Sequence, residues 1–352
     1  MAKSSSKLSL FAKIFIITVF IVFCIGVGFL VNTLKKVYSP NVEITGQTNA
    51  YIYIRTGSDL SEVCKSLYEN SYIVNRQSFE WLAKRMKYAE HIKPGRYKLS
   101  EGMSNKDLIE LLRSGKQEPV RFSINNIRLK SQLAGLAGRN LELDSTQLLH
   151  LLNDDNFVSN YGFNRNTIIS IFIPNTYEIF WNTDAESFVK RMKKEYDKFW
   201  NNDRLEKAKK IGYSPVEIIT IASIVDEESN VSAEFPTVAG VYINRLKRDM
   251  PLQADPTVKF AMGNFMLKRI FSKFLDFDSP FNTYKYKGLP PGPICIPSIK
   301  AINSVLNYER HNYLYFCAKS DFSGAHVFAK TLSQHNVNAA AYQKALNKKR
   351  IF

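Results

Sequence analysis

The stretch SPVEIITIASIVDEES, residues 214–229, predicts a helix with a clearly marked beginning. Ser214 and Glu217 have the spacing of a capping box, and Pro215 falls at the first helical position, where a missing N–H costs no hydrogen bond. Six of the eight residues in 218–225 are apolar. This helix is therefore expected to bury an apolar face in the core of a domain.

Three adjacent acids end this helix: Asp226, Glu227 and Glu228. Acids at a helix C-terminus oppose the helix dipole and repel one another, which suggests a function for at least one of them. At about 100° per residue, Glu227 lies opposite the apolar face and is expected to face water. Glu228 lies about 70° from the apolar centre and Asp226 about 90° away on the other flank. Burial at the rim raises a carboxyl pKa and suits a general acid, so Glu228 is the catalytic candidate; a solvated acidic helix end is the alternative.

Polar residues gather again after this helix. Asn, Gln, Arg and Tyr side chains can hydrogen-bond sugar hydroxyls and amides, and Tyr also offers a flat face to a sugar ring. The candidate substrate-binding residues are Asn244, Arg245, Gln253, Asp255, Thr257, Asn282 and Tyr284. The Gly/Pro run 288–293 is a turn or a cleft wall. For His326 and His335 a structural role is favoured, because neither has metal-ligand spacing.

The composition is that of a globular protein: 352 residues, 45% hydrophobic and 23% charged, with a net charge of +16. No HExxH, GxxxxGK[ST] or GxGxxG occurs, so we expect neither a metal nor a nucleotide cofactor. The four cysteines are scattered, and whether Cys295 and Cys317 pair is left open.

Residues 14–34 predict a transmembrane anchor. The segment lies between Lys13 and Lys35 without a charge, and its 18-residue core 14–31 is longer than a usual signal-peptide core. No small-residue cleavage site follows it, so an uncleaved anchor is favoured over a signal peptide. A slight excess of lysines in residues 1–13 makes this tail cytoplasmic and places the rest of the chain outside the inner (cytoplasmic) membrane as a single-pass protein. Nucleic acid is then excluded as a partner of the basic surface.

The remainder divides into a polar linker over 37–50, a small unit over 50–118 and a larger one over 120–350. The small unit reads as strand 50–55, helix 59–68, helix 78–86, strand 96–100 and helix 104–114. Glycan-binding modules of the LysM type share this size and order, as do many other modules. The expected fold class is α+β: one transmembrane helix, a small LysM-like subdomain and a larger catalytic domain.

Five blocks of the sequence, in order, resemble the YceG-like (MltG) family of endolytic murein transglycosylases. They are KPGRYKLSEGMSNKDLIELLRSGK, PNTYEIFW, the block IASIVDEESNVSAEFPTVAGVYINRLKRDMPLQADPTVKFAMG, FNTYKYKGLPPGPICIP and HVFAKTLSQHN. The resemblance implies a membrane-anchored enzyme that cleaves the MurNAc–GlcNAc bond of peptidoglycan without water. It would leave 1,6-anhydro-MurNAc ends and so limit glycan length. It also implies peptidoglycan strands as partner, with the cell-wall synthesis machinery as a further candidate.

The resemblance carries the essential acid of the family, the second Glu of a V-E-K-E-T motif, onto Glu228. Here the motif is V-D-E-E-S, so Glu227 replaces a lysine. The family's Glu-Gly before the P-N-T-Y block is Ile169-Ser170, and its Asp is Asn175, which puts any role for that glutamate in doubt. In the implied mechanism Glu228 protonates the glycosidic oxygen and then acts as base while the muramoyl 6-hydroxyl attacks.

Two other functions remain open at this point. One is a hydrolase of the same polymer with Asp255 as the second carboxylate, which would leave reducing ends instead of anhydro ends. The other is a non-catalytic glycan-binding scaffold protein of cell-wall synthesis, for which a strained acid such as Glu228 would be unnecessary.

Overall fold

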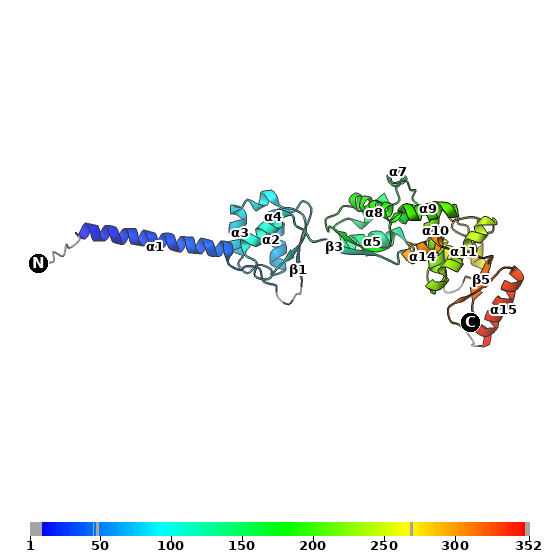
Figure 1. The fold of residues 1–352 in the computed structure, drawn as a ribbon. Coiled ribbons are helices and arrows are strands. Elements are labelled where there is room, and N and C mark those ends of the chain that lie inside the picture. Colours follow the sequence, from blue (N-terminus) through cyan, green and yellow to red (C-terminus); the bar gives the residue numbers. More distant parts are fainter. Residues whose placement is uncertain (1–8, 45, 47–48, 268–269, 349–352) are drawn as a thin grey trace. The chain divides into compact units, whose positions relative to one another are not determined.

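The computed structural model describes residues 9–44, 46, 49–267 and 270–348, and combines helices with short strands. The chain forms two compact units (Figure 1). Unit 1 extends to Val120 and includes the short return segment Phe180–Asn182. Unit 2 comprises Arg121–Ile179 and the chain from Thr183 onward.

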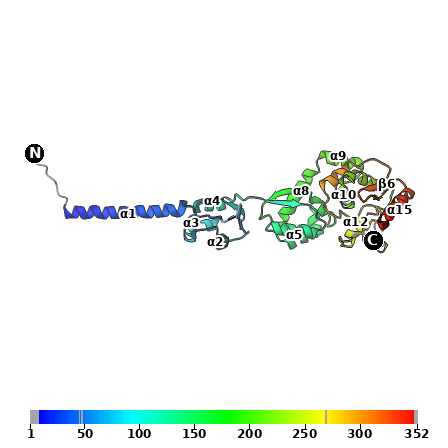
Figure 2. The same ribbon diagram turned by 90° about the horizontal axis from the view of Figure 1, so that it is seen from below.

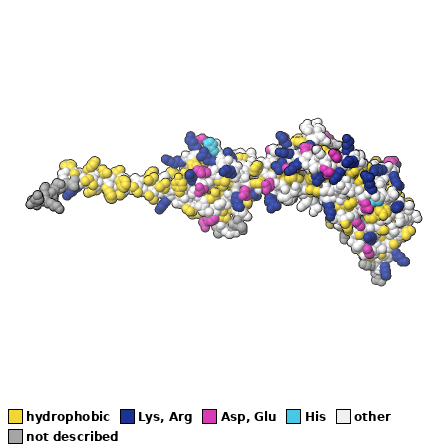
Figure 3. All heavy atoms as spheres, in the orientation of Figure 1, with side chains coloured by type: hydrophobic (Ala, Val, Ile, Leu, Met, Phe, Trp, Pro, Cys, Tyr) yellow, Lys and Arg dark blue, Asp and Glu magenta, His cyan; other side chains and the backbone are white. Residues whose placement is uncertain are grey.

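Unit 1 begins with α1 (Leu10–Tyr38), a helix of 29 residues that Ser9 caps. None of its residues is buried, and an 18-residue stretch of it has a mean hydropathy of 3.1, so the helix is long and apolar enough to cross a membrane. Hydrophobic side chains cover the face of α1 seen in Figure 3. The helix starts inside the expected tail 1–13 and ends inside the expected linker 37–50; residues 1–8 lie outside the described residues.

A small α+β core completes unit 1. Its elements are β1 (Ala50–Ile54), α2 (Leu60–Glu69), α3 (Arg76–Arg85), the 3-10 turn η1 (Tyr88–His91), β2 (Gly95–Leu99) and α4 (Asn105–Ser114). β1 and β2 pair antiparallel, with Ala50 opposite Leu99. The buried residues Leu67, Phe79 and Leu108 bring the three helices into one core with the strands. α2 starts with a capping box, in which the Asp59 side chain accepts the Glu62 N–H and the Glu62 side chain accepts the Asp59 N–H.

The segment that follows α1 packs into this core, although the sequence suggested a linker. Val42 is buried, and the Asn41 amide donates to Asn105 Oδ1 at 2.6 Å. Asn105 in turn donates to the Lys36 carbonyl at 2.9 Å, at the end of α1. Buried amides must find partners, and here they find them across the junction. The end of α1 is therefore fixed to unit 1, where it meets α3 and α4 (Figure 2).

Unit 2 is mainly helical. Its elements are β3 (Val120–Ile124), α5 (Lys130–Asn140), α6 (Ser145–Leu151), α7 (Asp155–Ser159), η2 (Ile168–Ile171), β4 (Asn175–Ile179), α8 (Ala185–Phe199), α9 (Asn202–Ile211), α10 (Pro215–Glu228), η3 (Ser232–Glu234), α11 (Phe235–Lys247), α12 (Asp255–Ala261), α13 (Ser272–Leu275), α14 (Ile299–Leu306), β5 (Tyr315–Ala318), β6 (His326–Ala329) and α15 (Leu332–Lys348). β3 pairs with β4, and β5 with β6. α10 lies among α9, α11, α12 and α14, and every residue from Ile218 to Val225 is buried.

The segment that follows the Gly/Pro run supports the C-terminal half of α10. The Ile294 N–H donates to Ser223 Oγ at 3.0 Å, and Ser298 donates its N–H and hydroxyl to Asp226 at 2.9 and 2.7 Å. Because Ser298 also caps α14, Asp226 joins the end of one helix to the start of another. Asp226 thus has a structural partner and is not free for chemistry.

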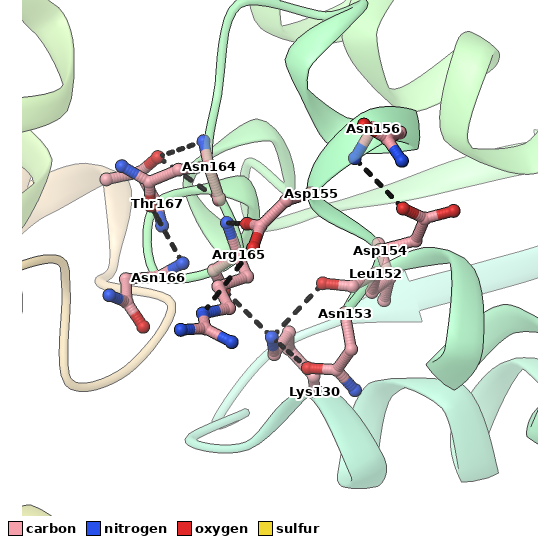
Figure 4. A network of polar contacts seen from close by, with 10 residues as sticks. All are labelled: Lys130, Leu152, Asn153, Asp154, Asp155, Asn156, Asn164, Arg165, Asn166 and Thr167. Carbon is pink, nitrogen blue, oxygen red and sulfur yellow. Dashed lines mark hydrogen bonds and ion pairs between the residues drawn. The ribbon is translucent and has the colours of Figure 1, made fainter.

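Gly292 packs against the loop that contains Asn166, and hydrogen bonds from Lys130 hold this loop in place. Lys130 donates to the carbonyls of Leu152 and Arg165 at 3.1 and 2.8 Å and to Asn153 Oδ1 (Figure 4). These bonds fix the loop against which the Gly/Pro run packs. A Cβ on Gly292 would stand 2.2 Å from the Asn166 carbonyl oxygen, so only glycine fits there. The position of the segment that supports α10 therefore depends on the close contact between Gly292 and the Asn166 carbonyl.

Candidate active site

A cavity of about 570 Å³ opens at the C-terminal end of α10. Side chains from α10, α11, α12, β5, β6 and α15 form its walls. The lining residues are Glu227, Glu228, Tyr242, Arg245, Leu252, Gln253, Asp255, Pro256, Lys259, Tyr284, Leu314, Tyr315, Phe316, Cys317, Ala318, His326, Leu332 and His335. The cavity is thus rich in polar and aromatic side chains, which suits a carbohydrate ligand.

Glu228 is the last residue of α10, and it brings a carboxyl into this cavity. Removal from solvent and, to a lesser extent, the negative charge of Asp255 together raise the pKa of Glu228 to about 8. The nearby cations Lys259 and Arg245 oppose this effect but do not cancel it. At neutral pH the carboxyl therefore holds its proton, as a general acid must.

Asp255 starts α12 and is bound by Tyr284, whose hydroxyl donates to Asp255 Oδ1 at 2.6 Å. Both residues line the cavity with Glu228. Burial and the Asp255 carboxylate raise the pKa of Tyr284, so the phenol stays protonated as a donor. The pair places a fixed negative charge near Glu228 without offering that carboxylate oxygen as a free nucleophile.

Tyr242 on α11 lines the same cavity as Glu228. Its hydroxyl lowers the pKa of Glu228, since a donor favours the carboxylate, but this effect is smaller than that of burial. Tyr242 is 2% exposed, and its Oη has no hydrogen-bond partner of regular geometry among the described residues. A buried hydroxyl without a regular partner is a free polar group at the site.

Arg245 organises one wall. The residue is buried, with 7% of its surface exposed. Arg245 Nε donates to the Leu314 carbonyl at 2.7 Å. Arg245 Nη1 donates to the Leu252 carbonyl at 2.8 Å and to Gln253 Oε1 at 3.2 Å. Gln253 adopts a left-handed backbone with φ of 52°, which turns the chain into α12. Arg245 thus joins the loop before α12 to β5, while both it and Gln253 line the cavity.

Glu227 differs from the expectation that it faces water. Its two carboxylate oxygens accept from Arg128 Nε and Nη2 at 2.9 and 2.8 Å, and its side chain is 26% exposed. The projection assumed a single buried face, but α10 is surrounded on several sides, and Arg128, just before α5, covers this one. The expectation of a solvated Glu227 is therefore wrong.

Three candidate binding residues do not line the cavity. The Asn244 amide donates to the carbonyls of His311 and Tyr313 at 2.7 and 3.0 Å. Thr257 is buried and bonds the Ala254 carbonyl at 2.7 Å, and Asn282 is buried and donates to two carbonyls of the preceding turn at 2.8 Å. These side chains satisfy backbone groups instead of ligands. Arg245, Gln253, Asp255 and Tyr284 are the four candidates brought together with Glu228.

The structure adds residues that the sequence did not assign. His326 and His335, for which a structural role was favoured, both line the cavity, as does Lys259. They come from β6, α15 and α12, segments that no local pattern connects to α10. The only signal was that the two histidines stand close together in a polar block. All four cysteines are free, so Cys295 and Cys317 do not pair.

One acid with a raised pKa, a paired aspartate and hydrogen-bonding and aromatic side chains surround one cavity, and these are the kinds of group that acid-catalysed cleavage of a carbohydrate uses. Comparison with known proteins identifies the family. The model of the YceG-like family matches residues 52–341, and the chain belongs to this family.

Named relatives and a solved structure agree with this assignment. A Bacillus subtilis (strain 168) protein named endolytic murein transglycosylase is 32% identical over 341 residues, which cover 92% of each chain. A Streptococcus pneumoniae (serotype 2, strain D39) protein of the same name is 29% identical over 82% of this chain and 57% of its own, so this chain spans little more than half of it. The crystal structure of a yceG-like protein from Listeria monocytogenes aligns with a TM-score of 0.55 and 28% identity, over 83% of this chain and 99% of that one.

Proposed function

We propose that this protein is an endolytic lytic transglycosylase of peptidoglycan. The name and 92% coverage of the Bacillus subtilis relative support the substrate and the reaction class. The observation that carries the mechanism is Glu228, a cavity-lining acid with its pKa raised to about 8. A non-catalytic glycan-binding protein would have no use for such a group, which destabilises the fold wherever the carboxyl is forced to ionise.

The reaction needs one acid and no water. Protonated Glu228 gives its proton to the oxygen between MurNAc and GlcNAc, and positive charge develops at the anomeric carbon as that bond breaks. The muramoyl 6-hydroxyl then attacks this carbon and closes the 1,6-anhydro ring. The proton that this hydroxyl loses finally restores the Glu228 carboxyl, so the enzyme returns to its starting state.

A hydrolase with Asp255 as the second carboxylate is the alternative that the structure weakens. A retaining hydrolase needs a free carboxylate as nucleophile, and an inverting one needs a carboxylate that activates water. Asp255 Oδ1 already accepts the Tyr284 hydroxyl, and the charge of Asp255 serves to keep Glu228 protonated. The route with Glu228 as the one acid is consistent with both the Tyr284–Asp255 hydrogen bond and the effect of Asp255 on the pKa of Glu228.

Anchoring and glycan binding complete the proposal. α1 would hold the protein in the inner membrane with its N-terminus in the cytoplasm and both units outside it, where peptidoglycan is made. Unit 1 would act as a LysM-like glycan-binding subdomain. A surface hollow of about 630 Å³ beside α2 and α3, which includes Tyr68, Arg76 and Glu80, is a candidate place for sugar contacts. Anchored beside the membrane, the enzyme would cut nascent strands and limit their length.

Digestion of purified peptidoglycan strands tests this function. The full chain in detergent should release products whose muramic ends are lighter by one water than hydrolysed ends, as mass spectrometry would show. Glu228→Gln should release none above background. Products with only reducing ends would replace the proposal by the hydrolase alternative.

A further inference from the structure

His326 is held beside the cavity by a carboxylate. It is the first residue of β6, and Glu234, at the end of η3, binds it twice. Glu234 Oε1 accepts the His326 backbone N–H at 2.8 Å, and Glu234 Oε2 lies 2.8 Å from His326 Nδ1. The two side chains are 13% and 15% exposed. Such a pairing fixes both the position and the tautomer of an imidazole.

The tautomer leaves one nitrogen available to a ligand. In a neutral imidazole whose Nδ1–H donates to a carboxylate, Nε2 carries the lone pair and accepts. No described residue of the chain forms a hydrogen bond with His326 Nε2. The ring packs edge-on against Phe316, with centroids 5.3 Å apart and planes at 86°, and both residues line the cavity. His326 therefore offers the cavity an oriented proton acceptor.

Other groups near the cavity are less suited to accept a proton. Arg128 binds both oxygens of Glu227, and Tyr284 binds Asp255. His335 lines the cavity, but burial lowers its pKa, so it stays neutral. The structure gives His335 no carboxylate within the described residues, so nothing there would stabilise its charged form.

Glu234 is also connected to the catalytic acid through the chain. Ser229 directly follows Glu228 as the C-cap of α10, and its hydroxyl donates to Glu234 Oε2 at 3.4 Å. Glu228 and the Glu234–His326 pair are thus built on adjoining segments around one cavity. By contrast, His311 has Nε2 2.9 Å from a backbone carbonyl and accepts a backbone N–H at Nδ1, which is a structural role.

We propose that His326 is the base that takes the proton from the attacking muramoyl 6-hydroxyl, with Glu234 as its positioning residue. This inference rests on the proposed function and divides its two proton transfers between two groups. The O6–C1 bond forms as the bond from C1 to the leaving oxygen breaks. Glu228 loses its proton to the leaving oxygen, and His326 Nε2 gains the proton of the 6-hydroxyl. Proton transfer from His326 to Glu228 then restores both groups, while the Glu234 carboxylate stabilises the charged imidazole in between.

Three variants of the full chain in detergent test this role. His326→Gln keeps a polar side chain but cannot carry the proton, so kcat should fall about 10²-fold while KM changes little. Glu234→Gln keeps an acceptor but loses the charge, and should lower kcat about tenfold, as loss of a positioning carboxylate does in order of magnitude. His326→Ala should regain anhydro-product formation when imidazole is added. His150→Gln, an exposed change on α6, is the matched control and should behave as wild type.

Products and melting curves separate this inference from the proposed function. With the 6-hydroxyl no longer activated, water competes for the anomeric carbon, so the share of hydrolysed ends should rise in the His326 variants. A folded His326→Gln with wild-type kcat, or a His326→Ala without imidazole rescue, would overturn the role of His326 alone. If wild type itself forms no anhydro ends, the proposed function fails instead. Loss of rate with normal melting and imidazole rescue supports the proposal.

Discussion

Replacing Glu228 by Gln should stabilise unit 2 and stop catalysis. In the folded protein the carboxyl has its pKa raised to about 8 from the ordinary 4.5, so at pH 7 the unfolded chain is ionised and the folded one is not. A raised carboxyl pKa costs stability as pH rises through this window. At 1.36 kcal/mol per unit, the cost is under about 1 kcal/mol at pH 5, about 3 at pH 7 and about 5 above pH 8. These are upper figures, because the side chain keeps some surface open to the cavity.

The amide that replaces the Glu228 carboxyl does not ionise in the unfolded chain, so Glu228→Gln removes this loss of stability. Glu228→Gln should therefore melt close to wild type at pH 5 and roughly 6–12 °C higher at pH 7, if unit 2 behaves as a domain of its size. Catalysis should fall by about 10²- to 10⁴-fold or more, since the amide has no proton to give. Thermal melting between pH 5 and 9, together with anhydro-product release, measures both effects.

Glu227→Gln is the matched control, with the same change of charge one residue away. It weakens the bidentate pair with Arg128, whose side chain is 42% exposed, so it should destabilise by about 1 kcal/mol or less. Its melting difference from wild type should not grow between pH 5 and 8, and its activity should stay within about tenfold, well short of the loss expected when a general acid is removed. An equal melting difference for Glu228→Gln at pH 5 and pH 8 would refute the buried, protonated acid. A large activity loss at Glu227 alone would mean that Glu228 is not the acid.

Three further changes and one measurement on the unaltered protein have defined outcomes. Asp255→Asn should lower the pKa of Glu228, because it removes the charge that raises it, and the alkaline fall of kcat/KM should move to lower pH; an unmoved profile would contradict this. Gly292→Ala should lower the melting temperature markedly in calorimetry, because its Cβ would meet the Asn166 carbonyl at 2.2 Å. A folded chain that begins near Val120 should bind polymer more weakly yet still form anhydro ends, and equally tight binding in a pull-down would show that the removed part of unit 1 does not bind glycan. Mass spectrometry of the membrane fraction should find the N-terminus intact, and a mature form lacking residues 1–36 would contradict an anchor.

Local signals predicted local structure well, because they act within a few residues. The capping box at Ser214 formed as predicted, and the helix expected over 104–114 is observed as α4, which ends at Ser114. The same short range explains why the helix pattern could single out Glu228 as the candidate acid. Its position predicted a carboxyl at the edge of the buried helix face, and the pKa raised by burial agrees with that position. The prediction that Glu227 faces water was wrong because its partner Arg128 lies 99 residues earlier in the chain, beyond the range of a local helix pattern.

Residue chemistry alone did not separate binding amides from structural ones. Asn244 and Asn282 have the side chains that recognise sugars, but the same amides satisfy backbone carbonyls in turns and between segments, and that is where the structure uses them. Which use applies depends on which carbonyls the fold leaves unpaired, and that is a tertiary property. The cavity histidines were missed for a related reason: His326 and His335 reach α10 only through the packing of β6 and α15.

The source of the oxygen at the newly formed sugar end tests the central claim most directly. Purified strands are digested by the full-length protein in water enriched in ¹⁸O, and the muramic ends are analysed by mass spectrometry. Intramolecular attack by the 6-hydroxyl predicts anhydro ends that carry no ¹⁸O, formed by wild type and lost in Glu228→Gln. Ends that incorporate one ¹⁸O from water would contradict the account and identify a hydrolase.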